Sequence, residues 1–177
     1  MVAVSASFGK NIDGKSISRL DGDMKTKTLF VSLALWFAAG VACFAASPQM
    51  GTWKMNEAKS KITPGTGKNT TVVYQSAFFK VKVTVDGTDA KGKPAHNEWT
   101  GNFDGKDYPV TGDPTSDARS YTKVDDRTLT FTVKKGGKVT VTGRVAISAD
   151  GKSRTVVTAG TTPKGKKFKN TAVYDKA

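Results

Sequence analysis

Period-two alternation of apolar and polar residues dominates the chain after residue 50 and most strongly limits what it can fold into. In 79–85, the letters Phe-Lys-Val-Lys-Val-Thr-Val place an apolar residue at every odd position. The stretches 129–134 and 139–145 alternate in the same way. Successive side chains of a strand point to opposite faces, so this pattern is typical of strands with one buried and one solvated face. No sustained helical stripe follows residue 50, and we therefore predict no long helix there.

Turn signals separate these alternating stretches. Asp86-Gly87, Asp104-Gly105 and Asp150-Gly151 can supply the positive φ that tight hairpins need, and Gly136-Gly137 and Lys164-Gly165 lie in similar settings. The pattern predicts strands near 51–55, 70–75, 78–86, 96–103, 107–111, 118–124, 128–134, 138–148, 153–161 and 167–175.

About ten short strands joined by hairpins make an antiparallel meander, and a meander avoids exposed edges most simply by closing on itself. We therefore predict an all-β fold, an antiparallel meander closing into a β-barrel of about 8–10 strands. An open two-sheet sandwich is the alternative, because both architectures use the same alternation.

The first 45 residues have a different character. Lys25 and Lys27 follow Met24, the run 29–42 contains no charged residue, and Cys43 and Ala45 occupy the −3 and −1 positions of a cleavage site. These features predict a signal-peptide helix over 24–45, with 1–23 a non-native extension ahead of the true start. A membrane anchor is disfavoured because a spanning helix needs roughly 20 apolar residues. A lipid on Cys43 is a further alternative.

Cleavage leaves residues 46–177, which we expect to form a single domain in the periplasm or outside the cell. Removing residues 1–45 takes away five of 28 basic and three of 15 acidic residues, so 23 basic and 12 acidic residues give a net charge of +11. The one cysteine is also lost, so the core alone must hold the fold. Its 132 residues suit one core. We expect a monomer with no membrane span after processing.

The two ends of this domain resemble the calycin superfamily of lipocalins and fatty-acid-binding proteins. Gly51-Thr52-Trp53 is similar to the first strand of these barrels, where Gly-x-Trp closes the base, and 172–176 looks like their last strand. The resemblance implies a meander barrel that holds an apolar small molecule. An arginine that the fatty-acid-binding branch carries two residues before the terminal tyrosine is replaced here by Ala172, so that branch's carboxylate anchor does not transfer.

Large aromatic residues fall on the faces that we assign as inward. In a closed barrel they can line a ligand cavity or fill the interior, and the sequence leaves both possibilities open. The candidate ligand-binding residues are Trp53, Phe79, Trp99, Phe103, Tyr121 and Phe131.

Basic residues gather at two expected hairpins and define an alternative site for anionic polymers of a cell envelope. Aromatic residues are not interleaved with these lysines apart from Phe168, so no nucleic-acid partner is expected. The candidate polyanion-binding residues are Lys134, Lys135, Lys138, Lys164, Lys166, Lys167 and Lys169.

Catalytic chemistry finds little support in the sequence. His96 is the only histidine and shares a strand face with Glu98, but no recognised nucleophile accompanies the pair, so no catalytic residue is assigned. One histidine and no cysteine after processing make a transition-metal site unexpected, and no cofactor is expected. An alternative calcium site would draw on acidic residues of one connection, namely Asp104, Asp107, Asp113 and Asp117.

Three functions follow from these features, in order of preference. The first is an exported, non-enzymatic barrel that binds a small, largely apolar molecule. The second is a basic module that associates with anionic envelope polymers. The third is an enzyme that uses His96 and Glu98.

Overall fold

The computed structural model describes residues 47–162 and 164–177, which contain ten strands and one short 3-10 turn, η1 (Glu57–Lys59). The predicted extension and signal peptide lie outside the described residues. The strands are β1 (Gly51–Met55), β2 (Lys68–Ala77), β3 (Lys80–Thr88), β4 (Pro94–Gly101), β5 (Tyr108–Thr111), β6 (Ala118–Lys123), β7 (Thr128–Lys135), β8 (Lys138–Ile147), β9 (Ser153–Thr161) and β10 (Lys167–Lys176).

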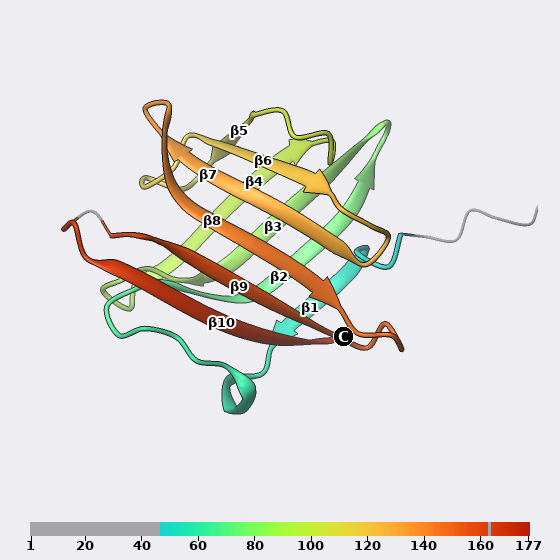
Figure 1. The fold of residues 1–177 in the computed structure, drawn as a ribbon, viewed down its shortest axis with the longest axis horizontal. Coiled ribbons are helices and arrows are strands. Elements are labelled where there is room, and N and C mark those ends of the chain that lie inside the picture. Colours follow the sequence, from blue (N-terminus) through green and yellow to red (C-terminus); the bar gives the residue numbers. More distant parts are fainter. Residues whose placement is uncertain (1–46, 163) are drawn as a thin grey trace, which may run out of the picture. The chain divides into compact units, whose positions relative to one another are not determined.

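All ten strands join into one closed antiparallel barrel in which each strand pairs with its neighbour in sequence (Figure 1). β1 completes the ring because it pairs with β2 on one side and with β10 on the other. Trp53 lies opposite Val72 in the first of these pairs and opposite Lys176 in the second. The predicted meander barrel is confirmed, and the alternative sandwich is wrong.

The barrel has two different ends. We call the end that carries the β3–β4, β7–β8 and β9–β10 hairpins the open end, which lies to the left in Figure 1. The other end, which we call the closed end, carries the β2–β3, β6–β7 and β8–β9 hairpins. β1 begins and β10 ends at the closed end, since Gly51 pairs with Tyr74 and Lys176 pairs with Trp53.

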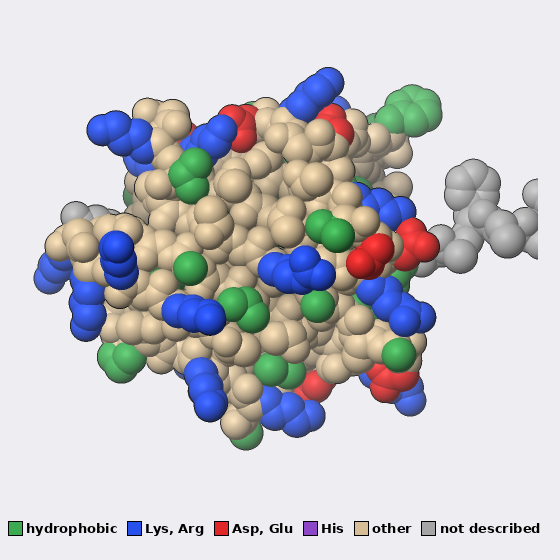
Figure 2. Space-filling model, viewed as in Figure 1, with side chains coloured by type: hydrophobic (Ala, Val, Ile, Leu, Met, Phe, Trp, Pro, Cys, Tyr) green, Lys and Arg blue, Asp and Glu red, His purple; other side chains and the backbone are tan. Residues whose placement is uncertain are grey.

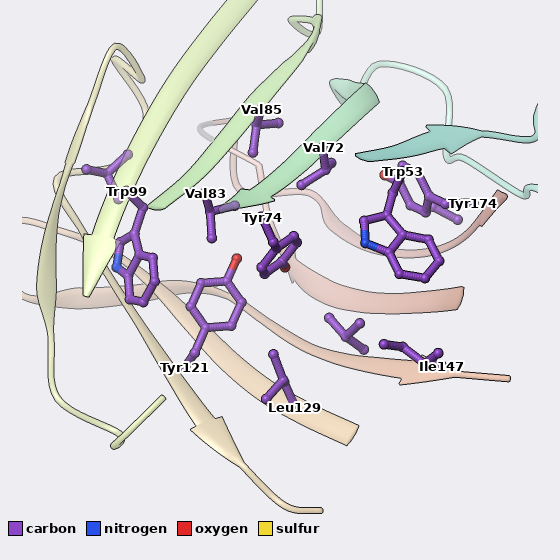
Figure 3. Close-up of a cluster of buried hydrophobic side chains, with 13 residues drawn as sticks. Trp53, Val72, Tyr74, Val83, Val85, Trp99, Tyr121, Leu129, Ile147 and Tyr174 are labelled. Atoms are coloured by element: carbon purple, nitrogen blue, oxygen red, sulfur yellow. The ribbon is translucent and has the colours of Figure 1, made fainter. Parts of the chain in front are cut away.

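The interior toward the closed end is filled by large side chains that alternate inward along the strands (Figure 3). Trp53 is fully buried and donates a hydrogen bond from Nε1 to the Gln49 carbonyl at 3.0 Å. Trp99 is equally enclosed and donates from Nε1 to the Arg119 carbonyl at 2.8 Å. Each indole therefore buries its apolar area without leaving its N–H unpaired.

One strand boundary differs from the prediction and changes the position of a predicted site residue. The sequence predicted a strand that starts at residue 78, with Phe79 pointing inward, but residues 78 and 79 form the β2–β3 turn. Phe78 has a φ of 54°, a left-handed conformation that a glycine would ordinarily supply. The hairpin has no glycine signal to mark the turn, and the two phenylalanines are 100% and 98% exposed. The inward assignment of Phe79 was therefore wrong.

No stretch of helix in the described part of the chain has the length and apolar character needed to cross a membrane. The barrel agrees with the architecture that the Gly-x-Trp resemblance implied, while membership of the calycin superfamily itself stays a prediction.

Replacing the two aromatic residues with opposite exposure tests this arrangement. Trp53→Ala is expected to lower the free energy of unfolding by about 3–5 kcal/mol, because it empties a fully enclosed site beside the closing strand. Phe79→Ala is the matched control and is expected to change it by less than about 0.5 kcal/mol, because the ring is already in water. Urea unfolding measures both values, and equal losses would contradict the assignment.

Candidate functional site

A cavity of about 800 Å³ extends from the middle of the barrel to the loops of the open end. Its wall is largely apolar, with valines contributed by β2, β3, β7, β8 and β9. Its mouth is formed by connections that include Gly65, Asp89, Pro114 and Thr162. A second hollow of about 510 Å³ lies among mostly exposed turn residues at the closed end. Ligand sites are usually concave and mainly apolar, so the barrel cavity is the candidate site.

The predicted aromatic residues separate into three groups in the structure. Tyr121 and Phe131 line the cavity. Trp53, Trp99 and Phe103 do not line it and pack in the filled part of the interior, where Trp99 and Phe103 stack with ring centroids 6.3 Å apart. Phe79 lies on the exposed β2–β3 turn instead. The interior is therefore filled toward one end and hollow toward the other.

Two buried arginines on the cavity wall were missed from the sequence. Arg119 is 8% exposed and Arg154 is 2% exposed, and both side chains line the cavity. Arg119 lies two residues before the inward Tyr121, so alternation along that strand was a usable signal. Around Arg154 the letters Thr-Val-Val-Thr place similar residues on both faces of β9, which left the inward face unmarked.

Arg154 lies at the inner end of the cavity in an enclosure of aromatic rings. Its Cζ atom is 5.0 Å from the ring centre of Trp53, 5.1 Å from that of Tyr74 and 4.7 Å from that of Tyr174. These residues meet because Tyr174 lies directly opposite Arg154 in the β9–β10 pair and Trp53 belongs to the neighbouring β1. Guanidinium groups are attracted to the faces of such rings. The four side chains form what we call the floor of the cavity.

Two floor tyrosines are held in the protonated form. Burial raises the pKa of Tyr74, and the neighbouring Tyr121 adds to this rise while the charge of Arg154 opposes it. Burial likewise raises the pKa of Tyr174, again against the effect of Arg154. Figure 3 shows Tyr74 and Tyr121 turned toward one another in the middle of the barrel. Both hydroxyls on the floor therefore remain neutral at physiological pH and carry no charge that could compensate the arginine.

Arg119 lies nearer the mouth, one residue inside the start of β6, and has polar company. Its Nη2 atom donates to Asn97 Oδ1 at 3.2 Å. Burial pushes the pKa of Asp113 upward, but hydrogen bonds from Ser116 and Thr115 and the charge of Arg119 together bring it below the usual value. The carboxylate of Asp113 is therefore ionised close to this arginine.

The seven predicted lysines all belong to two hairpins of the open end. Lys134 pairs with Asp107 at 2.6 Å, and the other six are exposed. Lys135 and Lys138 also line the cavity mouth. In Figure 2 basic side chains project from the left end, where these hairpins lie in Figure 1. The two sites that the sequence treated as alternatives thus meet at one rim.

His96 lies on the outside of β4, where its Nδ1 is 2.7 Å from Asp86 Oδ1 and its Nε2 is 3.9 Å from Glu98 Oε1. Lys82 donates a hydrogen bond to Glu98 and lowers the pKa of that carboxyl. Within the described ranges, no group of three or more histidine, cysteine or acidic residues is placed to hold a metal ion. Asp104 and Asp113 bond instead to the backbone and side chains of their own turns.

Comparison with known proteins adds little beyond the fold. No model of a known protein family matches the chain, and no curated protein does. Among solved structures, the chain is similar to a redesigned β-barrel, mFAP1, solved bound to DFHBI. The two share 19% sequence identity over 75% of this chain and 98% of that one, with a TM-score of 0.39. At these values the likeness says nothing about what this chain binds.

The lowered pKa of Asp113 gives a stability difference that depends on pH. A depressed carboxyl pKa stabilises the fold above the unfolded pKa of about 3.9, and this contribution is lost as the pH falls through the lower folded value. Asp113→Asn is therefore expected to lower the urea midpoint at pH 7 and to have a smaller effect near pH 2.5. Asp126→Asn, which removes a surface pair with Lys123, is the control and should matter little at either pH. A pH-independent loss in Asp113→Asn would contradict this assignment.

Proposed function

We propose that this protein is an exported, non-enzymatic carrier that binds one small, largely apolar molecule inside its barrel. The observation that supports the proposal most directly is the cavity of about 800 Å³, which lies within the size range of about 300–1,000 Å³ that is usual for ligand sites. Export is inferred from the signal features of residues 24–45.

Apolar burial would supply the driving force for binding. Ligand surface removed from water contributes about 25 cal/mol per Å², against which the loss of ligand freedom must be set. The wall is held by a closed sheet, so little of that gain is spent on ordering the protein. Selectivity would come from the length and width of the cavity and from the few polar groups on its wall, chiefly Asn97, Thr158 and Asn170.

A specific observation also favours the second candidate function, association with an anionic polymer of the cell envelope. Six exposed lysines crowd two hairpins that are neighbours in the barrel order, and Lys134 is the member of the set with an acidic partner. Such a cluster attracts polyanions in a salt-dependent way. This function and the carrier function are compatible, because one uses the rim and the other the interior.

Filling the cavity tests the carrier function. The probe is the methyl ester of 11-(dansylamino)undecanoic acid, an uncharged apolar molecule whose fluorescence rises in apolar surroundings. We expect saturable binding by the unaltered protein and a loss of at least about tenfold in affinity for Thr158→Trp, whose indole would occupy the cavity. Val157→Trp, on the outer face of the same strand, is the matched control and should bind normally. Absence of saturable binding in the unaltered protein would reject the carrier function.

Charge reversal tests the second function. Heparin serves as a soluble polyanion, and its affinity is expected to fall steeply with added salt. Replacing Lys164, Lys166, Lys167 and Lys169 by glutamate should lower this affinity at low salt by at least about tenfold. The control is the same number of reversals away from the rim, at Lys54, Lys80, Lys106 and Lys152. Equal losses in the two variants would show that net charge, and not the rim, determines binding.

A further inference from the structure

The guanidinium of Arg154 is buried without an acidic partner. Its residue is 2% exposed, and its Nε and Nη1 atoms have no hydrogen-bond partner among the described residues. Buried polar groups are nearly always paired, so an unpaired one in a folded protein needs an explanation. The rings of Trp53, Tyr74 and Tyr174 attract the cation but accept no strong hydrogen bond from it.

No negative charge of the cavity wall reaches this floor. The acidic residues that line the cavity are Asp89 and Asp113, and both belong to connections at the mouth. Asp89 is engaged there by the backbone N–H groups of Lys91 and Lys93, while Asp113 is engaged by Thr115 and Ser116. Since both floor tyrosines are neutral, the positive charge at the inner end of the cavity is uncompensated.

The rest of the cavity fits the other part of such a ligand. Between the floor and the mouth the wall is formed mainly by valines together with Phe131 and Ala172. Lys135 and Lys138 at the mouth add a positive potential that would draw an anion toward the opening. The polarity along the cavity therefore runs from a cation at the floor, through an apolar stretch, to a basic rim.

We propose that the cavity takes a monocarboxylate with an apolar tail, bound with its carboxylate against Arg154 and its tail extending toward the mouth. This deepens the proposed carrier function and rests on it. A guanidinium donates two parallel hydrogen bonds to a carboxylate, which suits one arginine with unused donors. A single negative charge balances a single buried positive charge, whereas a doubly charged phosphate would leave an excess buried there.

A matched pair of probes tests the proposal, namely 11-(dansylamino)undecanoic acid and its methyl ester, titrated at pH 7 by fluorescence. The unaltered protein is expected to bind the acid at least about tenfold more tightly than the ester, because only the acid can pair with the buried cation. Arg154→Met should lose this preference and keep an affinity for the ester within about twofold. Arg144→Met, which removes an exposed arginine from the outer face of β8, should keep the preference in full.

Thermal unfolding supplies an independent readout. Arg154→Met without ligand is expected to be at least as stable as the unaltered protein, because it removes an unpaired buried charge. The acid should raise the melting temperature of the unaltered protein and not that of Arg154→Met. A marked loss of stability in Arg154→Met would instead assign the arginine a structural role and overturn the proposal.

The outcomes separate this proposal from the carrier function. Equal affinities of the unaltered protein for acid and ester would overturn the carboxylate assignment and leave the cavity as a binding site. Failure of both probes to bind would reject the carrier function together with the proposal that rests on it. The comparison of acid with ester uses the unaltered protein, so it remains decisive whether or not Arg154→Met folds.

Discussion

The backbone hydrogen bonds of β1 hold the rest of the structure in place, because this five-residue strand joins β2 to β10 and turns a sheet into a ring. Without it the two neighbouring strands would each present a row of unpaired N–H and C=O groups. Trp53 on the same strand fills the centre of the closed end and lies under the ring contacts of Arg154 and Lys176. Closure and the filling of one end are therefore achieved by the same short segment, and the cavity is what remains above it.

The floor of the cavity illustrates how binding and stability can oppose one another. An apolar side chain in place of Arg154 would pack against Trp53, Tyr74 and Tyr174 without any buried charge. The protein keeps the cation and surrounds it with rings that lessen, but do not remove, the loss of its hydration. Such an arrangement is typical of a binding group that is completed by its ligand.

Much of the fold followed from sequence, because alternation and Asp-Gly or Gly-Gly turns locate strands and hairpins almost independently of context. The β2–β3 turn was misplaced because Phe78 takes up a left-handed conformation with no glycine to announce it. The site was harder to predict. Tyr121 and Phe131 were found by alternation, but Arg154 was not, since threonine and valine occur on both faces of β9 and the inward face is decided by the register with Tyr174.

The position of the chain ends has a practical consequence. Residues 47–50 lead into β1 at the closed end, and the backbone N–H of Ala177 donates to the Thr52 carbonyl there at 2.9 Å. The mouth and its lysine hairpins lie at the opposite end of the barrel. An affinity tag, a fluorescent fusion partner or a surface linker attached at the carboxyl terminus would therefore leave the opening unobstructed, so that immobilised molecules would present their cavities to the solution.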